Sequence, residues 1–434
     1  MPKKYIDFPS EIEGHTYTTK IEKLPEYVFH VGKLIVGNSS ILEDVSIRIA
    51  DGAITEIQEG RINSDGAIAR DFSNRIVMPG MIDSHTHLTF GGGTNILAPM
   101  PSIEYLTLCA AANATKTLEA GITTAADTIA PKDLPFALRD GIRDGLVKGP
   151  RFLCGGNFIV MTLARPFVRA SCREVSGPDD ARKAAREMIS KQADMLKVAA
   201  TNDPWFSFLR PPESTFRTEL TVEEMKAVAE EAHKTGRRLH SHALGPEGVR
   251  NSLEAGADVI VHGSPIGEDN MDLMVKKGVP WMTTMSYQYN NSPLGIDSQK
   301  SQKRSLPDWV VQNFKEVIEA MIKDLKMAVE KGLKISMGTD TGGANVMHGD
   351  NAWELQLYVK YGLTPMQAII AATKTAAETL DIDDYVGTIE TGKSADLLVL
   401  NKDPLQDISV LQKKEVIEHI FLKGVKVGGS LPTI

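Results

Sequence analysis

Histidines stand near the ends of several short apolar segments in this sequence of 434 residues, which contains ten histidines in all. His85 and His87 lie in MIDSHTHL, His242 in RRLHSHAL and His262 in DVIVHGS. Because side chains i and i+2 of a strand point to the same face, His85 and His87 can direct two imidazoles at one point. Imidazole nitrogen is a common ligand of zinc, so the four histidines indicate a metal site. The first pair alone also fits two satisfied histidines in a half-buried strand.

A lysine and an aspartate stand near the ends of two further apolar segments. Lys197 lies in DMLKVAA, and Asp340 ends KISMGTD. The carboxylate of Asp340 is a second type of metal ligand, whereas Lys197 taken alone fits a lysine with a packed stem and a solvated ammonium group. His240 shares a strand face with His242 but lies two residues deeper. We expect His240 to pack in the core or to contact a metal ligand from behind.

Eight apolar segments of this type, separated by amphipathic helices, must position these side chains. One such helix is TVEEMKAVAEEAHKTG, in which Thr221 is the expected N-cap, Glu224 completes a capping box and Gly236 ends the helix. Buried strands that each lead into a helix form parallel sheets. Eight of them predict an α/β fold with a (β/α)8 TIM barrel over residues 79–384, whose active site lies at the C-terminal ends of the strands. A doubly wound open sheet is the alternative, but no glycine-rich dinucleotide motif follows the first segment.

The two ends of the chain share a different, β-rich texture. VSIRIADGAITEIQEG alternates apolar and polar residues around the hairpin turn Asp51-Gly52, and EVIEHIFLKGVKVGG near the C-terminus alternates in the same way. We therefore expect residues 1–78 and 385–434 to form one small β-sandwich domain built from both termini.

Composition excludes several classes of protein. Lys and Arg number 48 against 56 Asp and Glu, and the resulting net charge of −8 argues against nucleic acid as a main partner. No apolar stretch approaches the ~20 residues that span a bilayer, and no apolar core follows the first lysines as in a secretory signal. The three cysteines are scattered, which suits a reducing compartment. We expect a cytoplasmic protein without membrane contact.

The order of these motifs resembles the amidohydrolase superfamily. The matching features are HTH after MPG, a lone lysine in the fourth segment, histidines in the fifth and sixth, and GTD in the eighth. GITTAAD, HGDNAWELQLYVKYGLTPMQAI and VGTIETGKSADLLVLNKDPL extend the resemblance over nearly the whole chain. Within the superfamily they point to the prolidase-like and imidazolonepropionase-like branch of metal-dependent hydrolases.

The resemblance implies a site for two divalent metal ions, for which zinc is the expected element. The implied ligands are His85, His87 and Asp340 for the more buried ion, His242 and His262 for the more exposed ion, and a carboxylated Lys197 that bridges both. Such ions activate water for attack on a carbonyl carbon. Asp340 is then the expected catalytic residue, because it can take a proton from that water and deliver it to the leaving amine.

The substrate is predicted only as a class. Where relatives carry a glycine-histidine segment after the third strand, this chain reads NFIVMTLARPFVRAS, which puts a plain Xaa-Pro dipeptide in doubt. We expect a small carboxylate-bearing molecule with an amide bond, such as a dipeptide, an N-acyl amino acid or an aryl amide. The insert NDPWFSFLRPPESTF fits an apolar lid over a bulky group and equally a packed surface loop.

Several side chains are candidates for contacts with that substrate. Arg165, Arg169 and Arg210 can each make a paired contact with a carboxylate. Tyr287 stands where the superfamily has a substrate-contacting tyrosine. Tyr289 is the alternative in the same segment, and each tyrosine also fits simple packing. His348 follows the eighth strand and fits either the pocket wall or a solvated loop.

Two other classes of function stay open. A mononuclear deaminase or cyclic-amide hydrolase of the same superfamily needs no carboxylated lysine, and Lys197 counts against it. A non-enzymatic scaffold on the same barrel would have lost ligands, and none is lost here. We expect a homo-oligomer that acts on a small-molecule substrate. About two, one or no metal ions per chain would distinguish the three classes.

Overall fold

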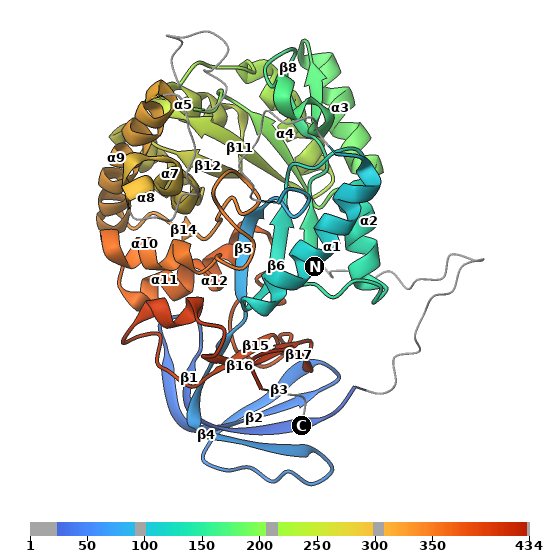
Figure 1. Ribbon diagram of the computed structural model, residues 1–434, viewed down its shortest axis with the longest axis vertical. Helices are drawn as coiled ribbons and strands as arrows, with labels where there is room; N and C mark the ends of the chain where they lie inside the picture. The colour runs from blue at the N-terminus through green and yellow to red at the C-terminus, as the bar shows by residue number, and fades with distance from the viewer. Residues whose placement is uncertain (1–23, 92–100, 205–215, 298–307, 432–434) are drawn as a thin grey trace, which may run out of the picture.

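The computed structural model describes residues 24–91, 101–204, 216–297 and 308–431. A parallel array of strands is surrounded by helices in the upper part of the molecule, and a sheet made from both ends of the described chain lies below it (Figure 1). This arrangement is the α/β fold with a TIM-type barrel that the sequence predicts.

Eight successive strand positions form the barrel, and all their pairings are parallel. The strands are β5 (Met81–Thr86), β6 (Ile122–Asp127), β7 (Arg151–Cys154) with β8 (Phe158–Met161), β10 (Met195–Ala199), β11 (Arg238–Leu244), β12 (Val259–Gly263), β13 (Trp281–Met282) and β14 (Ile335–Ser336). The backbone closes the circle, because Ser84 N donates to Met337 O at 3.0 Å and His87 N donates to Thr341 O at 2.7 Å. The C-terminal ends of the strands therefore lie together at one end of the barrel.

Helices follow the strands and cover the outside of the barrel (Figure 1). They are α1 (Ile103–Glu119), α2 (Leu134–Arg143), α3 (Pro178–Ser190), α4 (Val222–Lys234), α5 (Gly245–Ala255), α6 (Glu268–Lys277), α7 (Met285–Asn291), α8 (Pro293–Asp297), α9 (Asp308–Lys331), α10 (Trp353–Tyr361), α11 (Pro365–Ala371) and α12 (Lys374–Thr379). The start of α4 confirms its predicted signal, because Thr221 and Glu224 form a complete capping box.

The sequence predicts one strand for the third apolar segment, but the structure has two. The segment forms β7 and β8, with a break between them at which Gly156 adopts a φ of +78°. β7 pairs with β6, whereas β8 pairs with β10, so the break divides the barrel wall between two sheets. A left-handed glycine allows the backbone to change direction here without a Cβ clash. A further short strand, β9 (Cys172–Val175), pairs with β8 outside the eight barrel positions.

The lower sheet has seven strands in the order β17-β16-β15-β4-β1-β2-β3. From the first part of the chain come β1 (Tyr27–Ile35), β2 (Ile41–Ala50), β3 (Ala53–Glu59) and β4 (Ile68–Pro79), and from the last part come β15 (Leu397–Leu400), β16 (Ile417–Leu422) and β17 (Val425–Gly428). Both ends of the chain therefore share one sheet. The sandwich form and the domain boundaries at 78 and 385 stay predictions.

The β4–β15 pair is the seam between the two ends of the chain. Val77 pairs with Val399 and Met78 with Leu398 in an antiparallel ladder. Gly80 follows β4 at once, and a Cβ there would lie 2.1 Å from the Thr123 hydroxyl, so only glycine lets the chain pass from the sheet into β5. The strand that carries His85 and His87 thus begins directly where this sheet ends.

Deleting the chain from Val386 onward should prevent stable folding. The deletion removes Leu397, Leu398, Val399 and Leu400, all fully buried in β15. Each such side chain contributes about 1.5–3 kcal/mol when buried, whereas whole domains are stable by about 5–15 kcal/mol. Thermal unfolding and binding of an apolar dye measure the effect. The exposed Lys402→Ala is the control, and a truncated protein with an unchanged melting curve would contradict the shared sheet.

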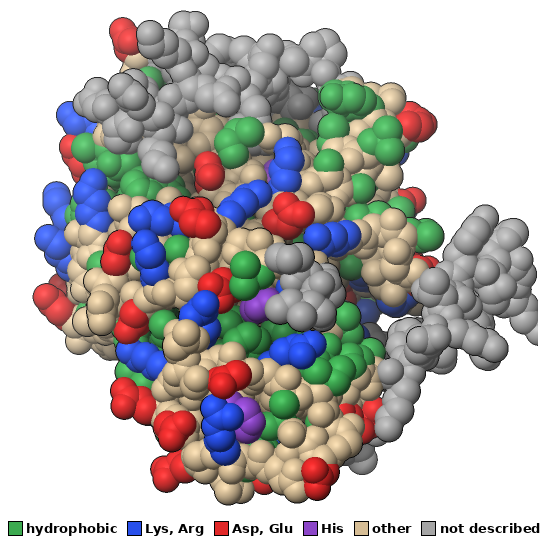
Figure 2. Space-filling model, turned by 60° about the horizontal axis from the view of Figure 1, so that its bottom comes forward, with side chains coloured by type: hydrophobic (Ala, Val, Ile, Leu, Met, Phe, Trp, Pro, Cys, Tyr) green, Lys and Arg blue, Asp and Glu red, His purple; other side chains and the backbone are tan. Residues whose placement is uncertain are grey.

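Charges of both signs are interspersed on the face that includes the lower sheet (Figure 2). This face carries no broad patch of one sign, in keeping with the small net charge of −8 over the whole sequence. In the described part of the chain, no helix combines the length and apolar character needed to cross a membrane.

Candidate metal centre

A buried cluster of metal-ligating side chains lies at the C-terminal ends of the barrel strands. Ligand atoms of His85, His262 and Asp340 all lie within 4.8 Å of one another. His87 joins them, because its Nε2 is 2.7 Å from Asp340 Oδ1. His242 completes the set, with its ring centroid 4.5 Å from that of His262. Side chains from β5, β11, β12 and the segment after β14 thus meet at one place, as the strand-end rule predicts.

His85 in β5 and His87, which follows β5 directly, each have a polar neighbour at the ring nitrogen away from the cluster. His85 Nδ1 lies 3.3 Å from the Thr128 hydroxyl, which leaves Nε2 facing Asp340 at 3.4 Å. His87 Nδ1 lies 3.6 Å from Asp127 Oδ1. Contacts of this kind fix the tautomer and direction of a metal-binding imidazole. Asp127 ends β6 and Thr128 follows it, so the neighbouring strand positions groups beside both rings.

His262 reaches the cluster through an unusual backbone conformation. Val261 packs inside the barrel with Met282, while Ile260 faces the helix layer. Regular alternation would turn His262 outward with Ile260, but its φ of +69° interrupts the alternation at the end of β12. His262 Nδ1 then lies 2.6 Å from the Thr284 hydroxyl. Backbone of this type is sparsely populated by non-glycine residues and is concentrated at functional sites.

Asp340 and Thr284 share this left-handed conformation, with φ values of +61° and +54°. Residues with left-handed backbone therefore lie near the end of β12 and after β13 and β14. Asp340 N donates to His85 O at 2.9 Å, which anchors the aspartate against β5. A Cβ at Gly338 would lie 2.8 Å from the Cβ of His85, so a glycine at 338 is needed for this close approach.

Lys197 lies inside the barrel next to the histidines. Its side chain is fully buried in β10, and Nζ lies 3.0 Å from His85 Nε2 and 5.3 Å from the centre of the Phe158 ring. Burial lowers the pKa of Lys197 to about 7, although the negative charge of Asp340 acts in the opposite direction. The lysine is therefore not the solvated surface residue that its type alone would suggest.

Burial keeps three of the four histidines in their neutral form. It lowers the pKa of His85 to about 3, and it lowers those of His242 and His262 well below the usual value. His87 is the exception, because hydrogen bonds to Asp127 and Asp340 outweigh its burial and raise its pKa to about 9. Negative charge next to His87 thus favours a cation at this place.

These side chains fit divalent cations. Neutral imidazoles offer lone pairs, Asp340 offers a carboxylate, and both are zinc ligands. Burial alone would raise the pKa of Asp340, but the adjacent imidazoles of His85 and His87 hold it well below the usual range, so the carboxylate is ionised. His242 Nε2 lies 3.2 Å from Asn202 O, and an N–H at this position donates to that carbonyl and leaves the imidazole lone pair on Nδ1. The donor chemistry agrees with the ligand set that the sequence predicts.

The predicted substrate-binding arginines have different surroundings. Arg165 is buried, donates from Nη2 to Thr201 O at 2.8 Å, and lies 4.8 Å from the centre of the Phe158 ring that Lys197 also contacts. Arg169 is 63% exposed and pairs with Glu174 at 3.1 Å, so the structure does not bring it to the cluster. Arg210 and most of the aromatic insert lie outside the described residues.

The two tyrosines and His348, the other candidates for substrate contacts, differ in how close they lie to the site. Gly343 lies three residues after Asp340, and a Cβ there would be 3.2 Å from the Tyr287 ring, so Tyr287 is near the site. Tyr289 instead receives a hydrogen bond from Lys360 at 3.2 Å on the helix side. The ring of His348 is buried between other protein groups, and its expected substrate contact is not supported.

The contacts of His348 explain this difference from the prediction. Nε2 lies 2.8 Å from Phe90 O, and Nδ1 lies 3.4 Å from the Thr117 hydroxyl of α1. Both ring nitrogens are therefore occupied within the protein. Burial lowers the pKa of His348 to about 4, so the ring is neutral and joins the loop after β14 to α1.

Sequence reasoning missed several residues that hold the ligands in place. Asp127 could have been found, because it ends the second strand as the ligands end theirs. Glu354 of α10 gave no such signal. Its carboxylate accepts from Met285 N at 2.7 Å, Ser286 N at 2.6 Å and the Thr283 hydroxyl at 2.6 Å, and so caps the start of α7.

Thr284→Val should weaken metal binding without unfolding the protein. Valine keeps the shape of threonine but removes the hydroxyl 2.6 Å from His262 Nδ1. Loss of such a contact costs about 10–100-fold in metal affinity. Competition with a chelating dye measures that affinity, and Thr284→Ser, which keeps the hydroxyl, is the control. Equal affinities in the valine and serine variants would show that the contact does not orient His262.

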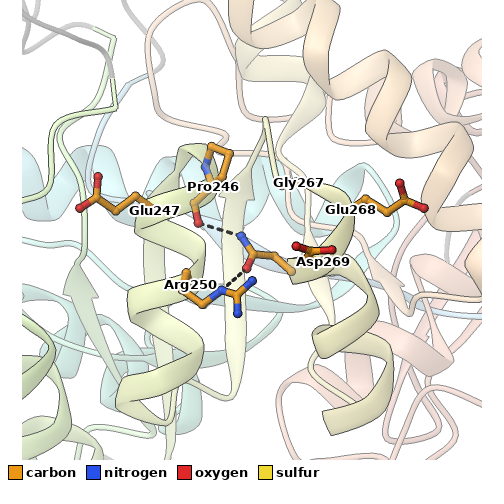
Figure 3. Close-up of a pocket in the computed structure, with 7 residues that line it drawn as sticks. Pro246, Glu247, Arg250, Gly267, Glu268 and Asp269 are labelled. Carbon is orange, nitrogen blue, oxygen red and sulfur yellow. Dashed lines mark hydrogen bonds between the residues drawn. The ribbon is translucent and has the colours of Figure 1, made fainter.

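A surface cleft lies apart from this centre, between the starts of α5 and α6 (Figure 3). Asn270 joins its two sides, because its Nδ2 donates to Pro246 O at 2.7 Å and its Oδ1 accepts from Arg250 Nε at 2.6 Å. Glu247 and Glu268 point away from each other on opposite sides of the cleft. The cleft contains none of the candidate metal ligands, and its carboxylates do not converge.

Comparisons with known proteins identify relatives of this chain. Ochratoxinase from Aspergillus niger is 26% identical over 92% of this chain and 85% of its own length. Imidazolonepropionase from Picrophilus torridus is 23% identical over 90% of this chain and 94% of its own length. A solved Xaa-Pro dipeptidase with methionine bound in its active site superposes with a TM-score of 0.83 at 29% identity, covering 92% of this chain and 99% of that one. Residues 76–427 match the amidohydrolase family, and the chain belongs to this family of hydrolases.

Proposed function

We propose that this protein is a binuclear metal-dependent amidohydrolase that cleaves the amide C–N bond of a small, carboxylate-bearing substrate. The observation that carries the proposal is the buried cluster of four imidazoles, three of them neutral, around ionised Asp340, with Lys197 beside it. His85, His87 and Asp340 would hold the more buried ion, and His242 and His262 the more exposed one. Divalent ions, with zinc as the expected element, lower the pKa of bound water from ~16 towards ~7 and polarise a carbonyl oxygen.

Lys197 would bridge the two ions as a carbamate. Neutral Nζ attacks carbon dioxide, so that an N–C bond forms, one C–O π bond opens to an oxyanion, and a proton leaves from nitrogen. The buried position supports this reaction, because a pKa of about 7 leaves much of the amine neutral at physiological pH. An unmodified ammonium group next to two divalent cations would instead be strongly repelled.

Asp340 would move the proton in the reaction. Its carboxylate is ionised, and Oδ1 already lies 2.7 Å from His87 Nε2 and 3.4 Å from His85 Nε2 at the centre of the cluster. From there it can accept a proton from the attacking water. As the C–N bond breaks, the same carboxyl group returns the proton to the leaving amine nitrogen.

The cysteines do not support a competing thiol mechanism. Burial raises the pKa of Cys154 well above its ordinary value and that of Cys172 to about 12, so both are thiols at neutral pH. The thiolate is the nucleophilic form of cysteine. A reaction through activated water therefore fits the described side chains better than a covalent thioester.

The substrate class rests on the relatives and on two nearby side chains. One structural relative binds methionine in its active site, which supports an amino-acid part in the substrate. Arg165 lies beside the same phenylalanine as Lys197 and is our candidate for the carboxylate contact. Tyr287 near Asp340 is the candidate for a second contact. Arg169 points to the surface and both ring nitrogens of His348 contact protein groups, so these two are weaker candidates. We further propose a cytoplasmic homo-oligomer.

A hydrolysis screen tests this proposal. Dipeptides ending in Pro or Arg, N-acyl amino acids and aryl amides of amino acids are incubated with the zinc-loaded enzyme, with and without a chelator. We expect release of an amino acid that the chelator abolishes. Lys334→Ala, an exposed substitution, controls for handling of the variant proteins. Amide cleavage that continues after complete metal removal would contradict the proposal.

One observation favours a second candidate function. The tightest group of ligand atoms contains only His85, His262 and Asp340, which suits a single ion. A mononuclear cyclic-amide hydrolase or deaminase would need no more, and imidazolonepropionase is among the relatives. Ammonia release from a heterocyclic amine, together with one ion per chain, would favour this alternative.

A further inference from the structure

His240 is a buried polar side chain that the assigned chemistry leaves unused. The residue is fully buried, and neither ring nitrogen has a hydrogen-bond partner among residues 24–91, 101–204, 216–297 and 308–431. A neutral imidazole has one donor and one acceptor nitrogen, so His240 has an acceptor available inside the barrel. Buried polar groups are normally hydrogen-bonded, so the unpaired ring nitrogens of His240 need an explanation.

The position of His240 indicates which partner this is. On β11, Ser241 turns outward and bonds Ser252 of α5 at 2.8 Å, so His240 and His242 face the barrel interior. Across the sheet, His240 is the register partner of Lys197 on β10. Residues paired in neighbouring parallel strands lie side by side on the same face. His240 is thus next to the stem of Lys197, on the barrel side of the metal ligands.

Lys197 needs a new acceptor when the site is loaded. Its Nζ lies 3.0 Å from His85 Nε2, a candidate metal-binding nitrogen. That nitrogen has one lone pair, which cannot both bind a metal ion and accept a hydrogen bond. A carbamate keeps one N–H on its nitrogen, and the ring of Phe158 at 5.3 Å from Nζ offers no strong acceptor in that direction.

Resting on the proposed function, we propose that His240 is a positioning residue that accepts the hydrogen bond of the carbamate N–H on Lys197. A carbamate is planar by the same resonance as a peptide bond. Fixing the direction of its N–H therefore fixes the directions of both oxygens, which must face the two ion sites. His240 itself binds no metal and transfers no proton in this role.

Zinc and bicarbonate loading of the full-length protein tests the role of His240. Metal-free enzyme is incubated with Zn²⁺ and graded ¹³C-bicarbonate, and the carbamate ¹³C signal and the zinc per chain are recorded. His240→Phe keeps a ring without nitrogen, and His240→Leu is a second variant without an acceptor. His240→Asn restores an acceptor oxygen. Val259→Ala is the control, because Val259 is the register partner of His240 on β12.

We expect His240→Phe and His240→Leu to need about tenfold more bicarbonate for half-loading, as for loss of one buried hydrogen bond. The bicarbonate concentration for half-loading of His240→Asn should lie closer to that of wild type. The concentration for Val259→Ala should equal that of wild type. The metal-free Phe variant should melt no lower than wild type, because an unsatisfied polar group has been removed. Wild-type bicarbonate curves in the folded Phe or Leu variant would overturn the inference. A zinc-loaded wild type without any carbamate signal would instead overturn the bridging role of Lys197, and with it the role of His240.

Discussion

Lys197→Ala is expected to lose the more exposed metal ion and to reduce amide hydrolysis by a factor of about 10³ or more, the scale of a catalytic group whose loss removes an activated nucleophile. The side chain is fully buried, and no other lysine among the described residues is buried. Metal content per chain and the hydrolysis rate are measured on the same sample. Short carboxylic acids such as acetate should partly restore both, because their carboxylate can fill the space of the carbamate.

A matched substitution separates this effect from loss of a positive charge. Lys334 precedes β14 and is 53% exposed, so Lys334→Ala should keep two ions and the full rate. Rescue should depend on the size of the acid, since the cavity left by Lys197 is enclosed. A Lys197→Ala protein that kept two tightly bound ions and full activity would remove the bridging lysine from the mechanism.

Asp340→Asn is expected to lower the turnover number by about 10²–10⁴-fold, the contribution of a positioned acid–base group. The amide keeps the size of the carboxylate and offers one oxygen to an ion, but it cannot accept a proton from water. Because Oδ1 contacts both His85 and His87, some loss of metal affinity should accompany the loss of rate. Turnover is therefore measured at saturating zinc, where the second effect is removed.

The exposed Asp350 provides the control for the Asp340 variant, because it lies in the same loop after β14. Asp350→Asn should leave turnover and metal content unchanged. If Asp340→Asn at saturating zinc retained the wild-type turnover number, another group would have to carry the proton.

The sequence predicts that the candidate ligands converge, because one rule places them. Side chains at the C-terminal ends of parallel strands must converge, so His85, His87 and His242 can be assigned once eight strands are recognised. His262 and Asp340 reach the same centre for a reason that the strand pattern does not contain. Both need left-handed backbone, with φ of +69° and +61°, which breaks the alternation on which strand reasoning depends.

Contacts across the fold are less predictable from local sequence. His348 follows the eighth strand, where a pocket residue is expected. Its ring nitrogens instead contact Phe90 and Thr117, which are far away in sequence. The strand pattern does not predict the surface position of Arg169 either, although here the cause is a local contact. The nearby Glu174 pairs with Arg169 on the surface. The division of the third segment into β7 and β8 also depends on which neighbouring strand each half pairs with.

In the proposed function, two metal ions at this cluster carry out amide hydrolysis. Stepwise reloading of the metal-free wild-type protein with zinc in bicarbonate buffer, with the rate of amide cleavage recorded against ions bound per chain, tests this directly. We expect little activity up to about one ion, a steep rise as the second ion binds, and a plateau at two. Full activity at one ion per chain, or cleavage by the metal-free protein, would contradict the proposed function.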